Sequence, residues 1–395
     1  MAGGAVTFLG SMETAEGRRS RRLNPPNRFE RLSDELAISV FVRTPFTSHD
    51  NVRACCQRTN ALLRSPEFRE ERIESGYAEE GIVIVGENET EDAEPATSWV
   101  VVGGLMRPIA KMSRPRYGLC STIANGEVFA IGVQVWGDGR GNGHGWTGED
   151  GSVEIYNPRT DEWRLLPNMV ERRGHAVCGV VGGSLVVAGR LSDSMGRWPK
   201  SSAEQLSLVP TGEWEKIPQP PHVIPGGMSC VLNGQLYTAG GWRSKKVQRW
   251  DGQAWSVLAS MPEQRYCAAS VVYEGCWWLI GGHCFENENG WESEDEEEED
   301  RHARYRYGTT DSVIFYDPQT NAWHEAEPLP QPLKHGNAIV IDGELVVVQM
   351  FIDGAVSFCY FKGQGWGQLP EAIAQKIPPI NRNMRINNLG SVLVG

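Results

Sequence analysis

The sequence lacks an apolar run of the roughly 18 residues that a membrane-spanning helix needs, and Met1 to Gly10 lacks the order of a signal peptide. Its nine cysteines include no CxxC pair and only one adjacent pair, Cys55 and Cys56, so the spacing of a zinc site is missing. Scattered cysteines in an odd number are typical of reduced thiols. We therefore expect a cytoplasmic and/or nuclear protein that needs no membrane, metal or other cofactor.

The sequence also has too few basic residues for a nucleic-acid-binding protein. Lys and Arg number 38 against 50 Asp and Glu, which gives a formal net charge of −12. Neutralising phosphates requires clustered Lys and Arg, so we expect no nucleic-acid ligand. Much of the acidic excess lies in the run 292–300. Such a run is typical of a solvated loop, and a clamp on a basic partner is the alternative.

Glycine and tryptophan, by contrast, are abundant, with 45 and 14 residues. Together they indicate many tight turns and repeated large apolar anchors, as all-β repeat folds require. The first residues do not share this pattern. Residues 1–27 are small, polar and basic, and we expect a disordered leader whose arginines (18, 19, 21 and 22) are either a nuclear import signal or a solvated tail.

Residues 28–76 are predicted to form three short helices, because their apolar residues recur with the helical period. So small a helical unit buries little apolar surface by itself, which favours docking onto something else. The signals that delimit the helices are Ser33 as the first N-cap, Pro45 as the first end, Ser48 at the second start, Ser65-Pro66 at the third start and Gly76 at the third end.

Three stretches of this unit resemble an F-box, namely 32–37, 55–58 and 61–68, and the last is similar to plant F-box/kelch proteins. The resemblance implies binding to a Skp1-like adaptor and its cullin, within an SCF-type E3 ubiquitin ligase. Ser33 stands where the family usually has Pro, and Thr59 where it usually has Trp. Losing a buried aromatic typically costs about 3–5 kcal/mol, so weakened adaptor binding is expected. The resemblance places the adaptor contacts at Leu32, Ser33, Leu36, Val40, Phe41, Val52, Cys56, Leu62 and Leu63. A helical cap that only packs on the rest of the chain is the alternative.

From residue 80 onward one pattern recurs five times. A basic residue, which Gly227 replaces in the third copy, opens an apolar strand, and a Gly-containing turn leads to a second strand that ends in glycine. A variable loop, a third strand, a Trp and a Pro follow. The Trp-to-Trp steps average about 50 residues, the length of a kelch repeat. The turns Asn125-Gly126, Asn233-Gly234 and Asp342-Gly343 are hairpin signals. We therefore expect a kelch β-propeller over 80–395.

The ends of the repeat region hold an incomplete sixth copy. Residues 82–85 and 99–102 look like outer strands, and residues 385–395 look like two inner strands. A composite blade made from about 80–110 and 380–395 would close the ring without a free edge. We expect six blades, with five as the alternative.

The long insertions, at 134–151, 191–203 and 283–310, all lie between second and third strands. Alternating strand direction would bring them to one mouth of the propeller. The opening basic residues should rim that mouth and bind a partly acidic target protein; they are Arg116, Arg173, Arg265, Lys334 and His335. Pairing of these side chains with neighbouring strand carbonyls and acids is the alternative. The stretch 143–148 matches GxGxxG, but a strand follows it instead of a helix, so we interpret it as a flexible loop.

Three functions remain open. The first is a non-catalytic substrate receptor of an SCF-type ligase, with an adaptor on the F-box and an unidentified target on the propeller. The second is a scaffold that binds proteins without ligase activity. The third, a kelch-fold enzyme such as a copper oxidase or a lyase, is the least favoured because no Cys, Tyr and His set converges on the channel.

Overall fold

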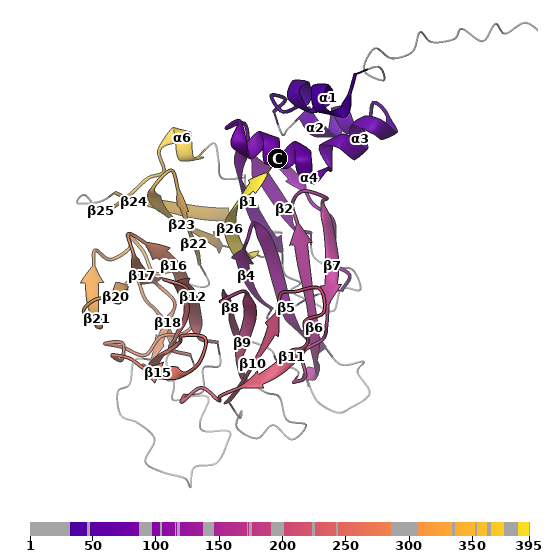
Figure 1. Cartoon of the computed structure of the whole chain (residues 1–395). Coiled ribbons are helices and arrows are strands. Elements are labelled where there is room, and N and C mark those ends of the chain that lie inside the picture. The colour runs from indigo at the N-terminus through magenta and orange to yellow at the C-terminus, as the bar shows by residue number, and fades with distance from the viewer. Residues whose placement is uncertain are drawn as a thin grey trace, which may run out of the picture.

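The computed structural model describes residues 32–45, 48–86, 97–102, 105–114, 116, 119–136, 146–171, 173, 176–190, 201–222, 226–241, 244–285, 307–333, 336–351, 354–361, 365–374 and 386–394. Four helices come first, and a mainly β region follows from residue 79 (Figure 1). None of the helices in these ranges is both long and apolar enough to cross a membrane.

The helical unit contains α1 (Asp34–Phe41), α2 (His49–Arg53), α3 (Gln57–Leu63) and α4 (Pro66–Glu74). Ser33 and Ser65 cap α1 and α4, as predicted, and accept hydrogen bonds from the amides of Leu36 and Phe68. The single second helix that we predicted is wrong. Cys56 adopts an extended conformation and forms a reciprocal capping box with Thr59, which ends one helix and starts another.

The core of the helical unit forms from one face of each helix. Its buried side chains come from α1, α3 and α4 and from the residue after α1; they are Ala37, Phe41, Val42, Leu62, Leu63 and Phe68. Leu36 and Val40 lie on α1 but outside this core, where solvent reaches them. The apolar residues of α1 therefore lie on two faces of the helix, and only one of these faces is buried within the unit.

The β region consists of six four-stranded antiparallel sheets among the described residues. Five are continuous in sequence, apart from a short ribbon in the fourth, and we number these blades one to five. Their strands are β4 (Cys120–Ala124), β5 (Glu127–Trp136), β6 (Trp146–Asn157) and β7 (Glu162–Leu166); β8 (Val177–Val181), β9 (Ser184–Arg190), β10 (Ser201–Ser207) and β11 (Trp214–Ile217); β12 (Met228–Leu232), β13 (Gln235–Ala239), β14 (Val247–Trp250) and β15 (Trp255–Val257); β16 (Ala269–Tyr273), β17 (Cys276–Ile280), β20 (Val313–Asp317) and β21 (Ala322–Ala326); and β22 (Asn337–Ile341), β23 (Glu344–Phe351), β24 (Gly354–Phe361) and β25 (Gly365–Gly367).

The sixth sheet is the composite blade that joins the two ends of the propeller. It contains β26 (Ile386–Val394), β1 (Glu79–Gly86), β2 (Trp99–Val102) and β3 (Leu105–Pro108) in that order. The C-terminal segment thus supplies one inner strand, not the two that we predicted, because β26 pairs along the whole length of β1. Innermost strands β4, β8, β12, β16, β22 and β26 contact one another in sequence, and β26 contacts β4, so the ring is closed.

The hairpins between first and second strands have the turns that the sequence predicts. Asn125-Gly126, Asn233-Gly234 and Asp342-Gly343 have positive φ at both residues, and so do Gly182-Gly183 and Glu274-Gly275. Paired positive φ values define the turn whose twist matches that of antiparallel strands. The same type of turn therefore joins the first and second strands in all five sequence-continuous blades.

A tryptophan in the fourth strand ties each of these blades to the blade before it. The indole nitrogen donates a hydrogen bond to a backbone carbonyl just beyond the preceding outermost strand, at 2.7–2.9 Å. The pairs are Trp163 with Ala110, Trp214 with Pro167, Trp255 with Pro218, Trp323 with Ala259 and Trp366 with Glu327. The repeated Trp is thus both an apolar anchor and a polar link between neighbours.

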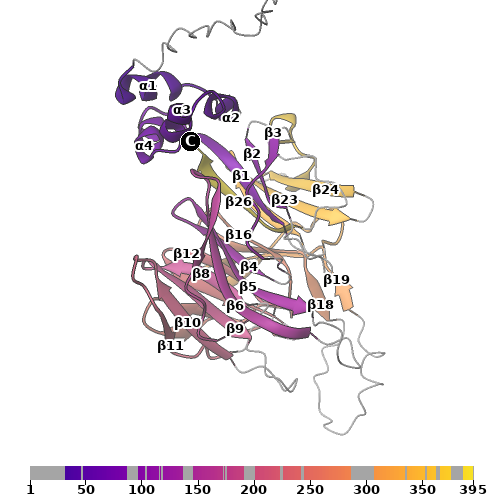
Figure 2. The same ribbon diagram turned by 90° about the vertical axis from the view of Figure 1, so that its right-hand side faces the viewer.

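The helical unit and the long insertions belong to opposite ends of the propeller. The helices lie over first-to-second and third-to-fourth connections: Arg69 of α4 approaches the Gly126 turn, and Arg64 pairs with Glu162 at the start of β7. Because the strands are antiparallel, the second-to-third connections leave from the other end. Figure 2 shows α1–α4 at one end and the β18–β19 ribbon, formed by His283–Phe285 and Tyr307–Thr309, at the other.

Second-strand glycines let adjacent blades approach closely, and a matched pair of variants tests this. Gly132 and Gly234 both have φ +72°, but a Cβ on Gly132 would lie 2.5 Å from the Arg173 carbonyl oxygen, whereas a Cβ on Gly234 meets nothing within 4 Å. Gly234→Ala should cost about 1–2 kcal/mol of unfolding free energy from backbone conformation alone. Gly132→Ala should cost at least about 2 kcal/mol more, because the next blade must move. Urea unfolding measures both, and equal losses would contradict the close approach.

Candidate functional site

The three described arginines of the predicted rim are buried. Arg116, Arg173 and Arg265 have almost no solvent exposure. We predicted that their guanidinium groups line the mouth as a binding surface. Their burial contradicts this prediction. Lys334 and His335, the other predicted rim residues, lie outside the described residues, as does the acidic run 292–300.

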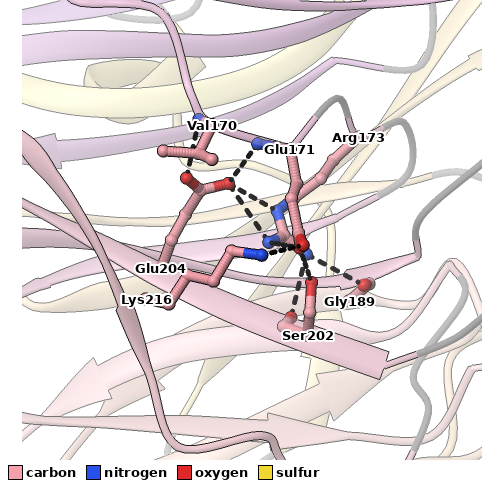
Figure 3. A network of polar contacts seen from close by, with 7 residues as sticks. All are labelled: Val170, Glu171, Arg173, Gly189, Ser202, Glu204 and Lys216. Carbon is pink, nitrogen blue, oxygen red and sulfur yellow. Dashed lines mark hydrogen bonds and ion pairs between the residues drawn. The ribbon is translucent and has the colours of Figure 1, made fainter.

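Arg173 shows where such a guanidinium goes (Figure 3). Its Nη1 donates to the carbonyl oxygens of Gly189 (3.2 Å) and Ser202 (2.9 Å), and its Nε and Nη2 donate to Glu204 Oε1 (3.2 and 3.1 Å). The second oxygen of Glu204 accepts from the Val170 amide at 2.8 Å. The arginine thus fastens the link from the preceding blade to the second and third strands of its own blade.

The same device recurs in other blades with different partners. Arg116 donates to Gly132 O (2.9 Å) and to Glu154 (2.7 Å), and Glu154 accepts from the Ser113 amide. Arg265 donates to backbone oxygens of its own blade, to Glu263 and to Ser312. A buried charge is tolerated when it is paired and hydrogen-bonded, and these groups are.

The third blade has neither the basic residue nor the carboxylate that the first and second blades have. Its repeat opens with Gly227 instead of a basic residue, and neutral Gln248 occupies the place of Glu154 and Glu204. Gln248 exchanges two 3.0 Å hydrogen bonds with the backbone of His222. The third blade thus lacks both the cation and the carboxylate that the first and second blades have, which supports a structural role for the arginine–glutamate pair.

Glu171 is the part of this network that solvent reaches. Burial opposes ionisation of its carboxyl, but hydrogen bonds from Lys216 and Ser202, with the charges of Arg173 and Lys216, outweigh it and lower the pKa of Glu171. Lys216 Nζ lies 2.6 Å from Glu171 Oε1. A charged pair therefore marks the insertion end of the second blade.

The insertion end also contains secondary structure that the sequence pattern did not predict. β5 extends to Trp136 and β6 starts at Trp146, so much of the predicted loop 134–151 is a hairpin extension. In the fourth blade β18 and β19 form a separate two-stranded ribbon. The flexible-loop interpretation of 143–148 is wrong for Trp146 to Gly148, which belong to β6, and residues 143–145 lie outside the described residues.

The residues predicted to contact an adaptor fall into two groups. Phe41, Leu62 and Leu63 are buried in the helical core, where they hold the unit together. Leu36 and Val40, one turn apart on α1, are 55% and 49% exposed. Ser33 is exposed at the α1 N-cap, and Leu32, Val52 and Cys56 are half-buried.

Two more large side chains near the end of the helical unit are exposed, and one of them lies beyond the predicted boundary at residue 76. Ile73 and Tyr77 are exposed large side chains, and the Arg43 guanidinium lies 6.0 Å from the Tyr77 ring centroid. We call Leu36, Val40, Ile73 and Tyr77 the helical apolar surface. The sequence analysis did not include the last two, because Tyr77 follows the end of α4 and the helical period does not reach it.

Arg72 joins the helical unit to the propeller, and His49 lies beside it. Buried Arg72 donates to the carbonyl oxygens of Val42 and Thr44, both at 2.6 Å, to Tyr77 O and to Glu79 of β1. His49 Nε2 donates to Thr44 O at 3.0 Å. Burial, followed by the charge of Arg72, lowers the pKa of His49 to about 4, so the imidazole is neutral at pH 7.

No group of three or more His, Cys, Asp and Glu residues within the described ranges could hold a metal ion. The exposed features are apolar side chains on helices and paired charges at strand ends. Such features are suited to binding proteins.

Comparison with known proteins agrees with the propeller geometry. A family model described as Kelch motif matches residues 143–170, which run from the β6 hairpin past β7. A solved structure titled "Structure of YjhT" superposes with a TM-score of 0.55 over 71% of this chain and 95% of that chain, at 14% identity, which shows the fold alone. The chain is therefore a mainly β protein with a propeller built from kelch repeats.

Two kinds of curated relative match at low identity. Kelch-like protein 23 of Homo sapiens is 25% identical over 229 residues, 57% of this chain and 35% of that protein. The F-box/kelch-repeat protein At4g14905 of Arabidopsis thaliana is 26% identical over 169 residues, 40% of this chain and 42% of that protein. The matched region thus spans less than half of each relative's length.

The first prediction concerns the arginine network. Arg173→Met leaves the Glu204 carboxylate buried without its cation and should cost about 3–5 kcal/mol of unfolding free energy. Adding Glu204→Gln reproduces the neutral arrangement at Gln248 and should restore most of this loss. Lys216→Met removes only an exposed partner and should cost less than about 1 kcal/mol. Urea unfolding of the four proteins checks this, and an Arg173→Met loss as small as that of Lys216→Met would refute the structural role.

The second prediction concerns pH. The pKa of His49 is lower in the folded chain than its ordinary 6.5, so the unfolded chain binds more protons at mildly acidic pH. Stability from this group is complete above pH 6.5 and is lost as pH falls toward 4. Between pH 7.5 and 5 it should decrease by about 2 kcal/mol. His49→Gln, which keeps a donor for Thr44, should remove that part of the pH dependence in urea unfolding; an unchanged slope would show that His49 is not its source.

Proposed function

We propose that the chain is the substrate-recognition subunit of an SCF-type E3 ubiquitin ligase. In this proposal the helical unit binds a Skp1-like adaptor and the propeller binds a target protein, while other subunits transfer ubiquitin in the cytoplasm or nucleus. The observation that carries the proposal is the exposure of Leu36 and Val40 on the α1 face that the helical core leaves uncovered.

An uncovered apolar helix face favours a protein partner. Leu36 and Val40 lie on adjacent turns of α1 and form one apolar ridge, and Ile73 of α4 and Tyr77, which follows α4, are exposed as well. Exposed apolar side chains that gather on one surface are typical of protein interaction sites. A partner with an apolar helix face would bury this surface and stabilise the small helical unit.

The two departures from the F-box pattern have structural roles in this chain. Ser33 caps α1, and Thr59 closes the capping box of α3 and donates to Val52 O at 2.8 Å. The helical unit is thus complete without the proline and tryptophan of the family pattern. These substitutions remove possible partner contacts without removing the scaffold that presents Leu36 and Val40.

The positions of the two ends support a receptor with two binding regions. The helices lie at one end of the propeller, and the insertion segments leave from the other. The Arg72 contacts fix α4 to β1, so the helical unit and the propeller are held as one body. A target at the insertion end would be held at a defined distance and orientation from the adaptor. One curated relative, by its name, combines an F-box with kelch repeats.

Co-purification with a Skp1-type adaptor tests the proposal. The wild type should retain the adaptor, and Leu36→Asp with Val40→Asp should weaken binding about 100-fold or more, because burying each side chain contributes about 1.5 kcal/mol or more. The matched control is Leu165→Asp with Val257→Asp, which changes a Leu and a Val on the propeller with exposures of 56% and 55%. Calorimetric titration gives the affinities.

One outcome would contradict the ligase role, and another would contradict only the assignment of the adaptor surface to α1. If the folded wild type binds no adaptor, the chain is a kelch scaffold that binds proteins through the propeller. If both double variants bind as tightly as the wild type, the adaptor uses another surface and the assignment of α1 is wrong.

A further inference from the structure

Arg43 extends the exposed apolar ridge of α1. Leu36, Val40 and Arg43 follow one another at the spacing i, i+4, i+7, which keeps side chains on one face of a helix. The residue after α1, Val42, still has helical dihedral angles and donates its N–H to Ile38 O, so this face continues to Arg43. All three side chains of the ridge are exposed. The ridge therefore consists of two apolar side chains followed by a cation.

The ring of Tyr77 lies beside this cation. The guanidinium carbon of Arg43 is 6.0 Å from the centroid of the Tyr77 ring, at the outer limit of a cation–π contact. Such a contact uses the face of the guanidinium and leaves its N–H donors available at the edge. Within the described residues no carboxylate forms an ion pair with Arg43. The N–H donors of Arg43 are therefore open to an acceptor from another molecule.

The buried guanidinium of Arg72 fixes the backbone at both members of this exposed pair. Its Nη1 donates to the carbonyl oxygens of Val42 and Thr44, the residues on either side of Arg43, both at 2.6 Å. Its Nη2 donates to the carbonyl oxygen of Tyr77. One buried side chain thus holds two segments that are more than 30 residues apart in sequence. A surface whose backbone is fixed before binding loses less conformational entropy when a partner binds.

We propose that Arg43, supported by Tyr77, binds a carboxylate of the adaptor at the edge of the apolar face that covers Leu36 and Val40. This inference rests on the proposed function, and it adds the chemistry of the partner: an apolar helix face with an Asp or Glu beside it. The paired N–H donors of a guanidinium match the two oxygens of a carboxylate. Arg and Tyr are also enriched among the residues that contribute most to binding energy at protein interfaces.

Calorimetric titration of the full chain with a purified Skp1-type adaptor tests this contact. Arg43→Gln should weaken binding about tenfold, and Arg43→Glu about 100-fold, because the reversal places two acids together. Arg43→Lys keeps the charge but loses the paired donors, so its affinity should lie between those of the wild type and Arg43→Gln. Arg164→Glu, which reverses an exposed arginine on β7, is the matched control and should bind within about twofold of the wild type.

The outcomes distinguish this inference from the proposed function. If the wild type binds the adaptor and Arg43→Glu binds as tightly as Arg164→Glu, the inference is overturned and the ligase proposal stands. If the wild type binds no adaptor, both are overturned. Thermal unfolding checks that a loss of binding is not a loss of folding. Each variant should unfold at the temperature of the wild type, because the Arg43 side chain is exposed.

A reciprocal experiment identifies the carboxylate. In a series of adaptors that each carry one Asp→Lys or Glu→Lys substitution, one variant should bind Arg43→Glu about tenfold more tightly than the unchanged adaptor does. The same variant should bind the wild-type chain more weakly, because two cations then face one another. If no adaptor variant shows this exchange of preference, Arg43 does not pair with a carboxylate of the adaptor and the inference is overturned.

Discussion

The hydrogen bond from each fourth-strand tryptophan to the preceding blade is the interaction on which the rest of the propeller depends. It fixes the spacing and the rotation between neighbours, because the indole can reach its carbonyl acceptor only when both blades are in place. At that spacing, the buried arginines attach the segments between blades to the second strands. Second-strand glycines such as Gly132 allow the neighbouring blade to approach as closely as the spacing requires. The composite blade starts its fourth strand with exposed Leu105 instead of a tryptophan, and its contact with the fifth blade is an apolar cluster containing Ile82, Ile339 and Val348.

Most of the fold could be predicted from the sequence because its signals are local and repeated. The Asn-Gly and Asp-Gly turns need positive φ at two successive residues, which few other sequences tolerate, and Ser33 and Ser65-Pro66 are N-cap signals read over four residues. The break at Cys56 was missed because cysteine is an unusual N-cap, and its role depends on Thr59 three residues later. The division of the composite blade was missed because one strand or two from residues 385–395 fit the same apolar pattern.

The candidate site could be predicted only in part, since burial depends on contacts between residues far apart in sequence. The pattern marked Arg116, Arg173 and Arg265 as equivalent, and they are, but it could not show that Glu154 and Glu204, more than 30 residues later, balance two of them. Leu36 and Val40 were included with Phe41 as one apolar set, and only the packing of α3 and α4 separates the exposed pair from the buried residue.

Closure of the ring by β26 sets the order in which the chain can mature during synthesis. The strand that pairs with β1 is the last one described, so β1 has an open inner edge until residues 386–394 leave the ribosome. The helical unit is attached to that same β1 through Arg72 and Glu79, and it is therefore attached to an incomplete blade until residues 386–394 have been made. A chain cut before Ile386 would lack the inner strand of the blade that carries α1–α4, even though the missing residues lie more than 300 positions after those helices in sequence.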